Sequence, residues 1–369
     1  MRVSPLHDQL KAGGAAFTEE CGREIVSAFA ARQAEYEAVR QTVGLTDFSF
    51  VQTYRFPEEK GVDLLDALVA GNVPRIRFGR VLHTFLADAD GLIVGDCYVA
   101  NNDREFIVMC ESIIPDAEVN ALFARHGLAE SGGQELTGSH VLLGLDGVRS
   151  WEVAKEVFGA DVLGLPYLSL EVYPFGGESV YLVRGGKTGE FGYLILAPAA
   201  AADALFERLR QSVARCQGRC CGTGIHHDLR LEGRFFNIHA EGRRVRDPLV
   251  LGLQWMIDFE KESFHGSAAI KQRRAEGLKR KIVGIAAEPG GPDLAPGAAI
   301  HDGDRAVAEV VAHCFSYTLG HPIGLAVFPV ELAYSGLDFR LGASDGPPVH
   351  TISMPPIMPR SLKVKLDEM

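Results

Sequence analysis

The chain has 369 residues, of which 47% are hydrophobic and 23% are charged, and its formal net charge is −11. This length and composition predict an ordinary soluble globular protein of two or three domains. The negative charge argues against a general nucleic-acid binder, which needs a concentrated basic face, and we interpret the basic residues between 271 and 281 as a solvated helix face rather than a binding patch.

The N-terminus lacks a charged segment followed by an apolar run, and no stretch is long and apolar enough to span a membrane. We therefore expect a cytoplasmic protein with no membrane partner. The seven cysteines are an odd number spread over a long chain, which predicts reduced thiols rather than a disulfide framework.

The spacing of apolar residues, glycines and prolines predicts helices and strands along the whole chain. In the first half the predicted helices are 27–43, 62–69 and 115–126, and the predicted strands are 43–50, 79–86, 92–94, 97–100 and 105–109. In the second half the predicted helices are 150–159, 198–215 and 268–276, and the predicted strands are 141–145, 169–174, 179–184, 193–196, 281–285, 306–312 and 324–328. The elements interleave without regular βαβ units, which favours an α+β fold over a doubly wound sheet. After residue 276 the Gly and Pro content between strands is typical of an antiparallel barrel with long loops.

A glycine-rich loop between two predicted strands is a candidate ligand site. It runs from Arg184 to Tyr193 with the sequence RGGKTGEFGY. A phosphate-binding P-loop would need glycine at position 181, where the chain has Tyr, so a phosphate cradle is disfavoured. Glu190 remains as a carboxylate acceptor suited to a ligand that presents two adjacent N–H donors.

Three other positions carry side chains that could serve chemistry or structure. Asp96 ends the stretch GLIVGD at the entry to a strand, where a lone carboxylate is often a turn residue. Arg230 lies in DLRLEG at 228–233, which we interpret as a strand on which Arg230 and Glu232 share a face and form an ion pair. Trp255 follows the segment GLQ, and a tryptophan there is usually part of the core.

A zinc site is a separate possibility that the sequence disfavours. Six soft ligands lie close together in the chain, namely Cys216, Cys220, Cys221, His226, His227 and His239. Their spacing matches no common zinc finger, and neighbouring side chains of a strand would point to opposite faces. We therefore expect no bound metal.

Taken in order, these segments resemble the glycine cleavage T-protein (aminomethyltransferase) family. The loop is similar to the family signature R-x-G-Y-T-G-E-D-G, with Lys187 in place of Tyr and Phe191 in place of Asp. GLIVGD is similar to a hairpin that ends G-G-x-x-D-D, DLRLEG to L-R-L-E-x-G, and residues 261–266 to K-x-x-F-x-G. The resemblance covers nearly the whole chain and implies a three-domain α+β fold around a central folate cavity, with a C-terminal antiparallel β-barrel. The implied domains are 1–50 plus 138–275, 51–137, and 276–369.

The resemblance also implies tetrahydrofolate as the cofactor and gives roles to five residues. Asp96 would lie beside the reactive nitrogen, where an anion stabilises the positive charge that develops as the nitrogen receives a carbon and can take its proton. Glu190 would receive the N–H edge of the pterin ring, so we expect Asp96 and Glu190 to meet across one pocket. Arg230 would orient Asp96 or bind the folate carboxylates. Trp255 would pack on the aromatic part of folate, and Cys110, where the family often has Asn, would lie near the pterin.

The implied activity is a tetrahydrofolate-dependent one-carbon transfer. The donor would be a small molecule that carries a methyl group or a lipoyl carrier protein that carries an aminomethyl group. Differences from the family place a divergent methyltransferase or demethylase level with a glycine-cleavage aminomethyltransferase; they lie at Phe50, Gly95, Cys110, Lys187, Phe191, His226 and Val250. A non-catalytic folate-binding regulatory or iron–sulfur assembly protein is the alternative, and its assembly branch is disfavoured because the motif K-G-C-Y-x-G-Q-E is replaced by SFHG at 263–266.

Overall fold

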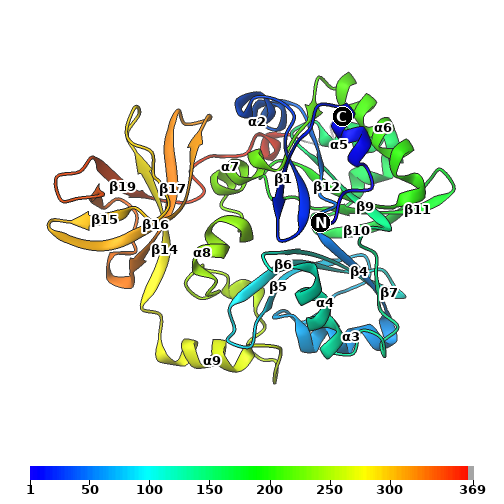
Figure 1. Ribbon diagram of the computed structural model, residues 1–369, viewed down its shortest axis with the longest axis horizontal. Helices are drawn as coiled ribbons and strands as arrows, with labels where there is room; N and C mark the ends of the chain where they lie inside the picture. The colour runs from blue at the N-terminus through cyan, green and yellow to red at the C-terminus, as the bar shows by residue number, and fades with distance from the viewer. Residues whose placement is uncertain (365–369) are drawn as a thin grey trace.

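The computed structural model describes residues 1–364, which form two open sheets, a closed barrel, a short hairpin and surrounding helices (Figure 1). The hairpin consists of β1 (Ala16–Glu20) and β2 (Arg23–Ala28). The α-helices are α1 (His7–Ala12), α2 (Arg32–Gln41), α3 (Glu58–Leu68), α4 (Asp116–Arg125), α5 (Ser150–Phe158), α6 (Ala199–Arg215), α7 (Gly224–Gly233), α8 (Arg243–Val245) and α9 (Ser267–Glu276). Short 3-10 turns lie at Val73–Arg75, Ala160–Gly164, Gln254–Met256, Val330–Leu332 and Arg360–Lys363, and a π-helical turn at Ile238–Gly242.

The first sheet has six strands and carries the glycine-rich loop. Its order is β10 (Ser169–Phe175), β11 (Glu178–Arg184), β12 (Gly192–Pro198), β9 (His140–Asp146), β3 (Gly44–Asp47) and β13 (Arg219–Cys220). All its pairs are antiparallel except β13 with β3. Helices α5 and α6 cover one face, and α6 contributes Leu205, Leu209 and Val213, which recur every four residues and are buried.

The second sheet is antiparallel and carries Asp96. Its order is β5 (Val81–Ala87), β6 (Ile93–Asn101), β7 (Glu105–Ser112), β4 (Gln52–Pro57) and β8 (Gln134–Glu135). Helices α3 and α4 cover its outer face through buried residues such as Leu65, Leu68 and Phe123. Strands β6 and β7 of this sheet are buried on both faces, in agreement with their largely apolar sequences.

The inner faces of the two sheets pack against each other. Their shared core contains Tyr98 and Met109 from the second sheet and Leu142 and Leu196 from the first. Because side chains alternate along a strand, Asp96 and Glu111 belong to the same inner faces as Tyr98 and Met109. The polar residues of the second sheet are thereby brought to the meeting point of the two layers.

The C-terminal barrel lies beside the two sheets, as Figure 1 shows. Its order is β14 (Arg280–Ala287), β17 (His321–Pro329), β16 (Arg305–Ser316), β15 (Ala299–Asp302), β18 (Asp338–Leu341) and β19 (Pro348–Ile352), which pairs with β14 to close the barrel. Every pair is antiparallel. The predicted α+β class and antiparallel barrel are confirmed, whereas the exact division into 1–50 plus 138–275, 51–137 and 276–369 stays a prediction.

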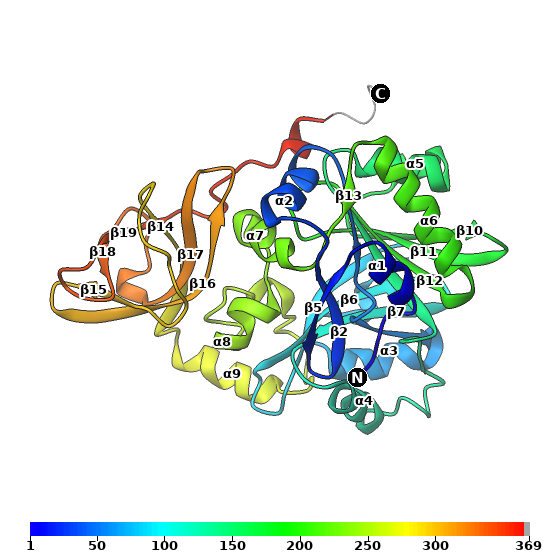
Figure 2. The ribbon, with the colours of Figure 1, turned by 45° about the horizontal axis from the view of Figure 1, so that its top comes forward.

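The segment after the barrel returns to the first sheet. Figure 2 shows it running from the barrel to a short turn beside α2. There the backbone N–H and hydroxyl of Ser361 donate to Glu190 at 2.8 and 2.6 Å, and Phe191 donates its N–H to the same hydroxyl. The end of the described chain therefore fixes the outer side of the glycine-rich loop.

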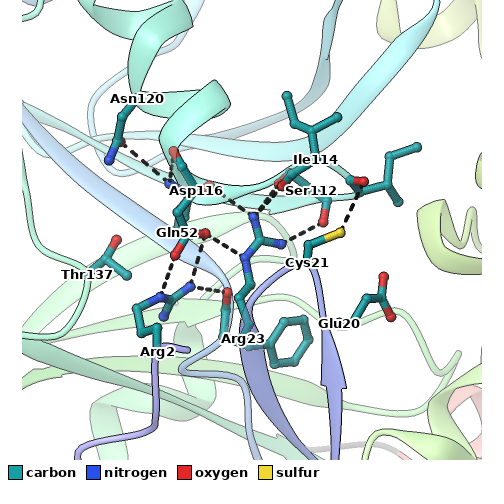
Figure 3. A network of polar contacts seen from close by, with 12 residues as sticks. Arg2, Glu20, Cys21, Arg23, Gln52, Ser112, Ile114, Asp116, Asn120 and Thr137 are labelled. Carbon is teal, nitrogen blue, oxygen red and sulfur yellow. Dashed lines mark hydrogen bonds and ion pairs between the residues drawn. The ribbon is translucent and has the colours of Figure 1, made fainter.

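Two arginines, one of them buried, attach the N-terminal segment and its hairpin to the second sheet (Figure 3). Arg23 is 2% exposed and donates to Asp116 at 2.5 Å, to the backbone and hydroxyl of Ser112, and to the carbonyl of Ile114. Arg2 donates to Asp116 at 2.7 Å. Because a buried guanidinium needs several acceptors, this network gives the hairpin one fixed position next to β7.

Three local predictions from the sequence are wrong. Residues 228–233 belong to helix α7 rather than to a strand, because Ile225 and Leu229, four residues apart, are both buried. The predicted helix 27–43 begins only at Arg32, since β2 continues to Ala28. The predicted strands 92–94 and 97–100 form a single strand, β6.

Candidate functional site

Two adjoining cavities lie where the inner faces of the sheets meet α7. The first, which we call the acid cavity, has a volume of about 50 Å³ and carries the polar side chains of Asp96, Glu111, Asp146, Lys187, His226 and Arg230. The second, the histidine cavity, has a volume of about 210 Å³ and carries those of Glu20, Glu111, His226, His227, Arg230 and His239. Glu111, His226 and Arg230 border both, so the two cavities form one polar region.

Asp96 is buried in the acid cavity, where its carboxylate contacts His83 and Lys187. One carboxylate oxygen lies 2.7 Å from Nε2 of His83, and the other accepts from the ammonium of Lys187. Burial opposes ionisation, but the charge of Lys187 and the contact with His83 outweigh it and lower the pKa of Asp96. Asp96 is therefore a fixed, ionised carboxylate, but Lys187 already neutralises it; its role beside a reactive nitrogen stays a prediction.

Glu111 and Arg230 form a buried bidentate ion pair between β7 and α7. The two guanidinium nitrogens donate to the two carboxylate oxygens at 2.8 and 3.1 Å, and Lys187 lies 3.4 Å from the same carboxylate. Burial raises the pKa of Glu111, but Arg230, Lys187 and His239 together lower it well below its usual range. Arg230 borders the cavity but binds Glu111 rather than Asp96 or Glu232, and its contact with folate carboxylates stays a prediction.

Two of the three histidines that border the cavities, His226 and His239, differ in how readily they carry a positive charge. His226 is fully buried, its Nε2 lies 3.0 Å from the hydroxyl of Thr46, and burial together with the nearby Arg230 lowers its pKa to about 3. Burial disfavours the charged form of His239 as well, but its contacts with Glu111 and Glu20 raise its pKa above the ordinary value. The region therefore carries a neutral imidazole next to one that is more readily protonated.

Glu190 does not face the acid cavity, so the prediction that Glu190 and Asp96 meet across one pocket is wrong. Glu190 lies on the other side of the glycine-rich loop, where Arg40 donates to it at 3.1 Å and Ser361 donates twice. It borders a different hollow, formed by α2, the barrel and the C-terminal segment. All of these contacts hold the loop in place, so the structure gives Glu190 a structural position instead of a ligand-facing one.

Sequence comparison decides the family. The sequence model of the GCVT N-terminal domain matches residues 6–261, and that of the glycine cleavage T-protein C-terminal barrel domain matches residues 280–356. The chain belongs to the glycine cleavage T-protein family. It is 28% identical to the aminomethyltransferase of Synechococcus sp. RCC307 over 91% of this chain and 93% of the relative, and 29% identical to that of Mycobacterium leprae Br4923 over 89% of each. The crystal structure of glycine cleavage system aminomethyltransferase T from Bartonella henselae has the same fold, with a TM-score of 0.81, 20% identity, and coverage of 97% of this chain and 99% of that one.

Two other predicted site residues of this T-protein family member lie outside both cavities. Cys110 is on β7 between Met109 and Glu111, so its side chain points to the opposite face, into the core beneath α3 and α4. The prediction that Cys110 lies near the pterin is therefore wrong. Trp255 is 64% exposed, so its interpretation as a core residue is also wrong, and its ring contacts that of His83 edge to face at 5.3 Å. Packing of Trp255 on a folate stays a prediction.

The sequence did not indicate three acids that line the cavities of this family member, Glu20, Glu111 and Asp146. Lys187 was visible only as a difference from the family signature, and Glu111 could have been found from strand alternation, since it lies two residues after Met109. Asp146 gave no local signal, and His239 was singled out only as a disfavoured zinc ligand, because both reach the site through the packing of the two sheets and the turn after α7.

Among the helices of residues 1–364, none is long and apolar enough to cross a bilayer. Within the same residues, no three His, Cys, Asp or Glu side chains gather closely enough to hold a metal ion.

Glycine at position 186 makes room for the carboxyl of Asp146, and we expect Gly186→Ala to destabilise the protein by about 1–3 kcal/mol, as overpacking does. A Cβ there would lie 2.7 Å from Oδ1 of Asp146 and 3.2 Å from the backbone of Gly192. Urea unfolding measures the effect. Gly164→Ala is the matched control, since its Cβ would meet nothing within 4 Å; equal stability of the two variants would contradict the close packing at Gly186.

Proposed function

We propose that the chain is a tetrahydrofolate-dependent one-carbon transferase that moves a methyl or aminomethyl group from a donor to tetrahydrofolate. Membership of the T-protein family supports this activity, and curated relatives that match over about nine-tenths of the chain are named aminomethyltransferases. The observation that carries the proposal is the buried, ionised Asp96 in the acid cavity. A fixed anion in a water-poor cavity stabilises a developing positive charge more strongly than one in water.

The residues of the two cavities fit a reduced folate in their chemistry. The acid cavity offers Asp146, a carboxyl that no cation among residues 1–364 holds, beside apolar walls, and the histidine cavity offers His239 and Arg230 for anionic groups. A volume of about 50 Å³ holds only a few water molecules. A ligand with a two-ring head must therefore extend into the histidine cavity or displace the side chain of Lys187.

In this proposal tetrahydrofolate supplies a secondary amine that accepts the carbon. Asp96 stabilises the positive charge on that amine and can accept its proton. Because one oxygen of Asp96 binds Lys187 and the other lies against His83, Asp96 becomes free to do so only when the ammonium of Lys187 moves towards Glu111. Lys187 would then keep Asp96 ionised before the ligand binds and form its ion pair with Glu111 afterwards.

A second candidate is a folate-binding protein that transfers no carbon. The neutralisation of Asp96 by Lys187 favours it, because a carboxylate with a permanent cation cannot stabilise a second positive charge equally well. The two candidates predict the same ligand and differ only in turnover.

The deciding experiment incubates the purified protein with tetrahydrofolate and a panel of donors, followed by mass spectrometry of the folate products. The panel contains methylated amines, methylated sulfur compounds, O-methyl compounds and an aminomethylated lipoyl carrier protein. We expect methyl- or methylene-tetrahydrofolate from one class of donor. Tight folate binding, measured by calorimetry, with no product from any donor would support the non-catalytic alternative, and absence of folate binding would exclude both.

A further inference from the structure

Asp146 is a buried acid of the acid cavity that no cation holds in the described chain. It is the last residue of β9 and is 5% exposed. The hydroxyl of Thr188 donates to Oδ1 at 3.2 Å, and within residues 1–364 this is its one side-chain hydrogen bond. By contrast, Asp96, Glu111 and Glu190 each bind a lysine or arginine. A buried carboxylate with a single donor leaves most of its acceptor capacity open.

Three glycines keep the space around this carboxyl free. Added Cβ atoms at Gly186 and Gly192 would lie 2.7 and 3.0 Å from Oδ1, and one at Gly144 would lie 3.5 Å from Oδ2. Gly144 and Asp146 are two residues apart on β9 and therefore point to the same face, towards the ring of Phe48. The carboxyl thus lies in a hollow bordered by backbone, and Oδ2 accepts no hydrogen bond from the described residues.

The walls of the acid cavity around Asp146 suit the edge of a flat ring. Its apolar walls are formed by side chains from both sheets and the segment between β3 and β4, namely Phe48, Val51, Met109, Leu142 and Leu194. Apolar walls with a few placed polar groups are typical of small-molecule sites. A ring with two neighbouring N–H donors would satisfy the open oxygen of Asp146 without bringing a full charge into the cavity.

We propose that Asp146 is the acid that binds the N–H donor edge of the ligand ring, the part that the sequence assigned to Glu190. This inference rests on the proposed function, because the ring in question is the pterin-type head of a reduced folate. It makes Asp146 a specificity-determining residue: a ring without these donors would leave the buried carboxyl unpaired and bind more weakly.

The charges around Asp146 predict how this binding depends on pH. Burial raises the pKa of Asp146 to about 7, while the hydroxyl of Thr188, Arg230 on α7 and Arg40 on α2 lower it only in part. From the other packed elements, His226 faces the cavity as a neutral imidazole, and Lys187 is held by Asp96 and Glu111. The ionised carboxylate accepts both N–H groups best. Ligand affinity should therefore rise by about tenfold between pH 6 and pH 8, as the ionised fraction grows.

Calorimetric titration with tetrahydrofolate and with its 2-desamino analogue, which lacks one donor, tests the proposal. We expect Asp146→Asn to weaken binding of tetrahydrofolate by roughly 10- to 100-fold, as for loss of a hydrogen bond to a charged group. The variant should also lose both the preference over the analogue and the pH dependence. Asp47→Asn is the matched control, because Asp47 is equally buried, accepts from Ser49 and borders neither cavity.

The outcomes separate the inference from the function on which it rests. If the unmodified protein binds tetrahydrofolate with no pH dependence and no preference over the analogue, or if Asp146→Asn binds as tightly as the unmodified protein, the assignment of Asp146 is overturned and the proposed function stands. If the unmodified protein binds no reduced folate at any pH, the proposed function fails and the assignment fails with it. The pH profile of the unmodified protein needs no variant, so the test holds even if Asp146→Asn does not fold.

Discussion

Replacing Asp96 with Asn is expected to lower the rate of one-carbon transfer by roughly 100-fold or more while leaving folate binding nearly intact. Asn keeps the size of the side chain and can still contact His83, which lies 2.7 Å from the carboxylate. It removes the negative charge that the accepting amine needs as it becomes positive. Single-turnover kinetics with the donor found in the screen, alongside calorimetric folate binding, measure the two effects separately.

The control for this prediction must show that the fold survives the change. Asp96→Asn leaves the ammonium of Lys187 with Glu111 as its remaining anionic partner, 3.4 Å away, so urea unfolding of the variant should be compared with that of Asp47→Asn. An unchanged transfer rate would remove Asp96 from the mechanism. Loss of folate binding and transfer together would instead make Asp96 a residue that binds folate.

The fold was largely predictable because its signals are local. The alanine-rich helix 198–215, the strands around Asp96 and the glycine-separated strands after residue 276 all follow patterns of spacing that depend on a few neighbouring residues. The prediction failed at 228–233, where Leu229 and Leu231 alternate as in a strand. There the burial of Ile225 one turn earlier decides for a helix, and this burial depends on α2 and the barrel, which no short window contains.

The site was less predictable because it depends on which way each side chain points. Asp96 and Arg230 border the acid cavity, whereas Glu190 and Cys110 lie one or a few residues from positions that do. On β7 a shift of one residue exchanges the core face for the cavity face, so Glu111 lies where Cys110 was expected. In the glycine-rich loop the direction of Glu190 is set by Arg40 and by Ser361, which is 171 residues away in the chain. Neither contact has a local signal.

The acid cavity combines these side chains into a charge arrangement that no single motif reveals. Lys187 forms ion pairs with both Asp96 and Glu111, and Arg230 on α7 forms one with Glu111. Each of these two acids of the second sheet therefore has a cationic partner from outside that sheet. Asp146, from the first sheet, has no cationic partner in the part of the chain that the structure describes. In the proposed function, the neutral N–H donors of a ligand therefore bind at Asp146. A cationic centre is stabilised at Asp96 once Lys187 has moved.

Arg40 is the residue whose loss we expect to cost the most stability. Its guanidinium donates to Glu190 at 3.1 Å, to Glu232 at 2.8 Å and to the carbonyl of Thr188 at 2.8 Å, and its side chain is 6% exposed. Removing it leaves two buried carboxylates without their cation, and removal of one partner from a buried pair destabilises a protein by about 3–5 kcal/mol. Arg40→Met should lower the free energy of unfolding in urea by at least this amount. Arg210→Met, which removes an exposed ion pair with Glu207, should leave it nearly unchanged.

A double-variant cycle then tests the structural position of Glu190. In the Arg40→Met background, Glu190→Gln removes one of the two unpaired buried charges and should restore part of the lost stability, whereas in the unmodified protein the same change should destabilise. Because Glu190 accepts from Ser361 and Arg40 and faces away from the acid cavity, Glu190→Gln should also leave the preference for tetrahydrofolate over its 2-desamino analogue unchanged. Additive stability changes, or loss of that preference, would return Glu190 to the ligand site and contradict its assignment to the fold.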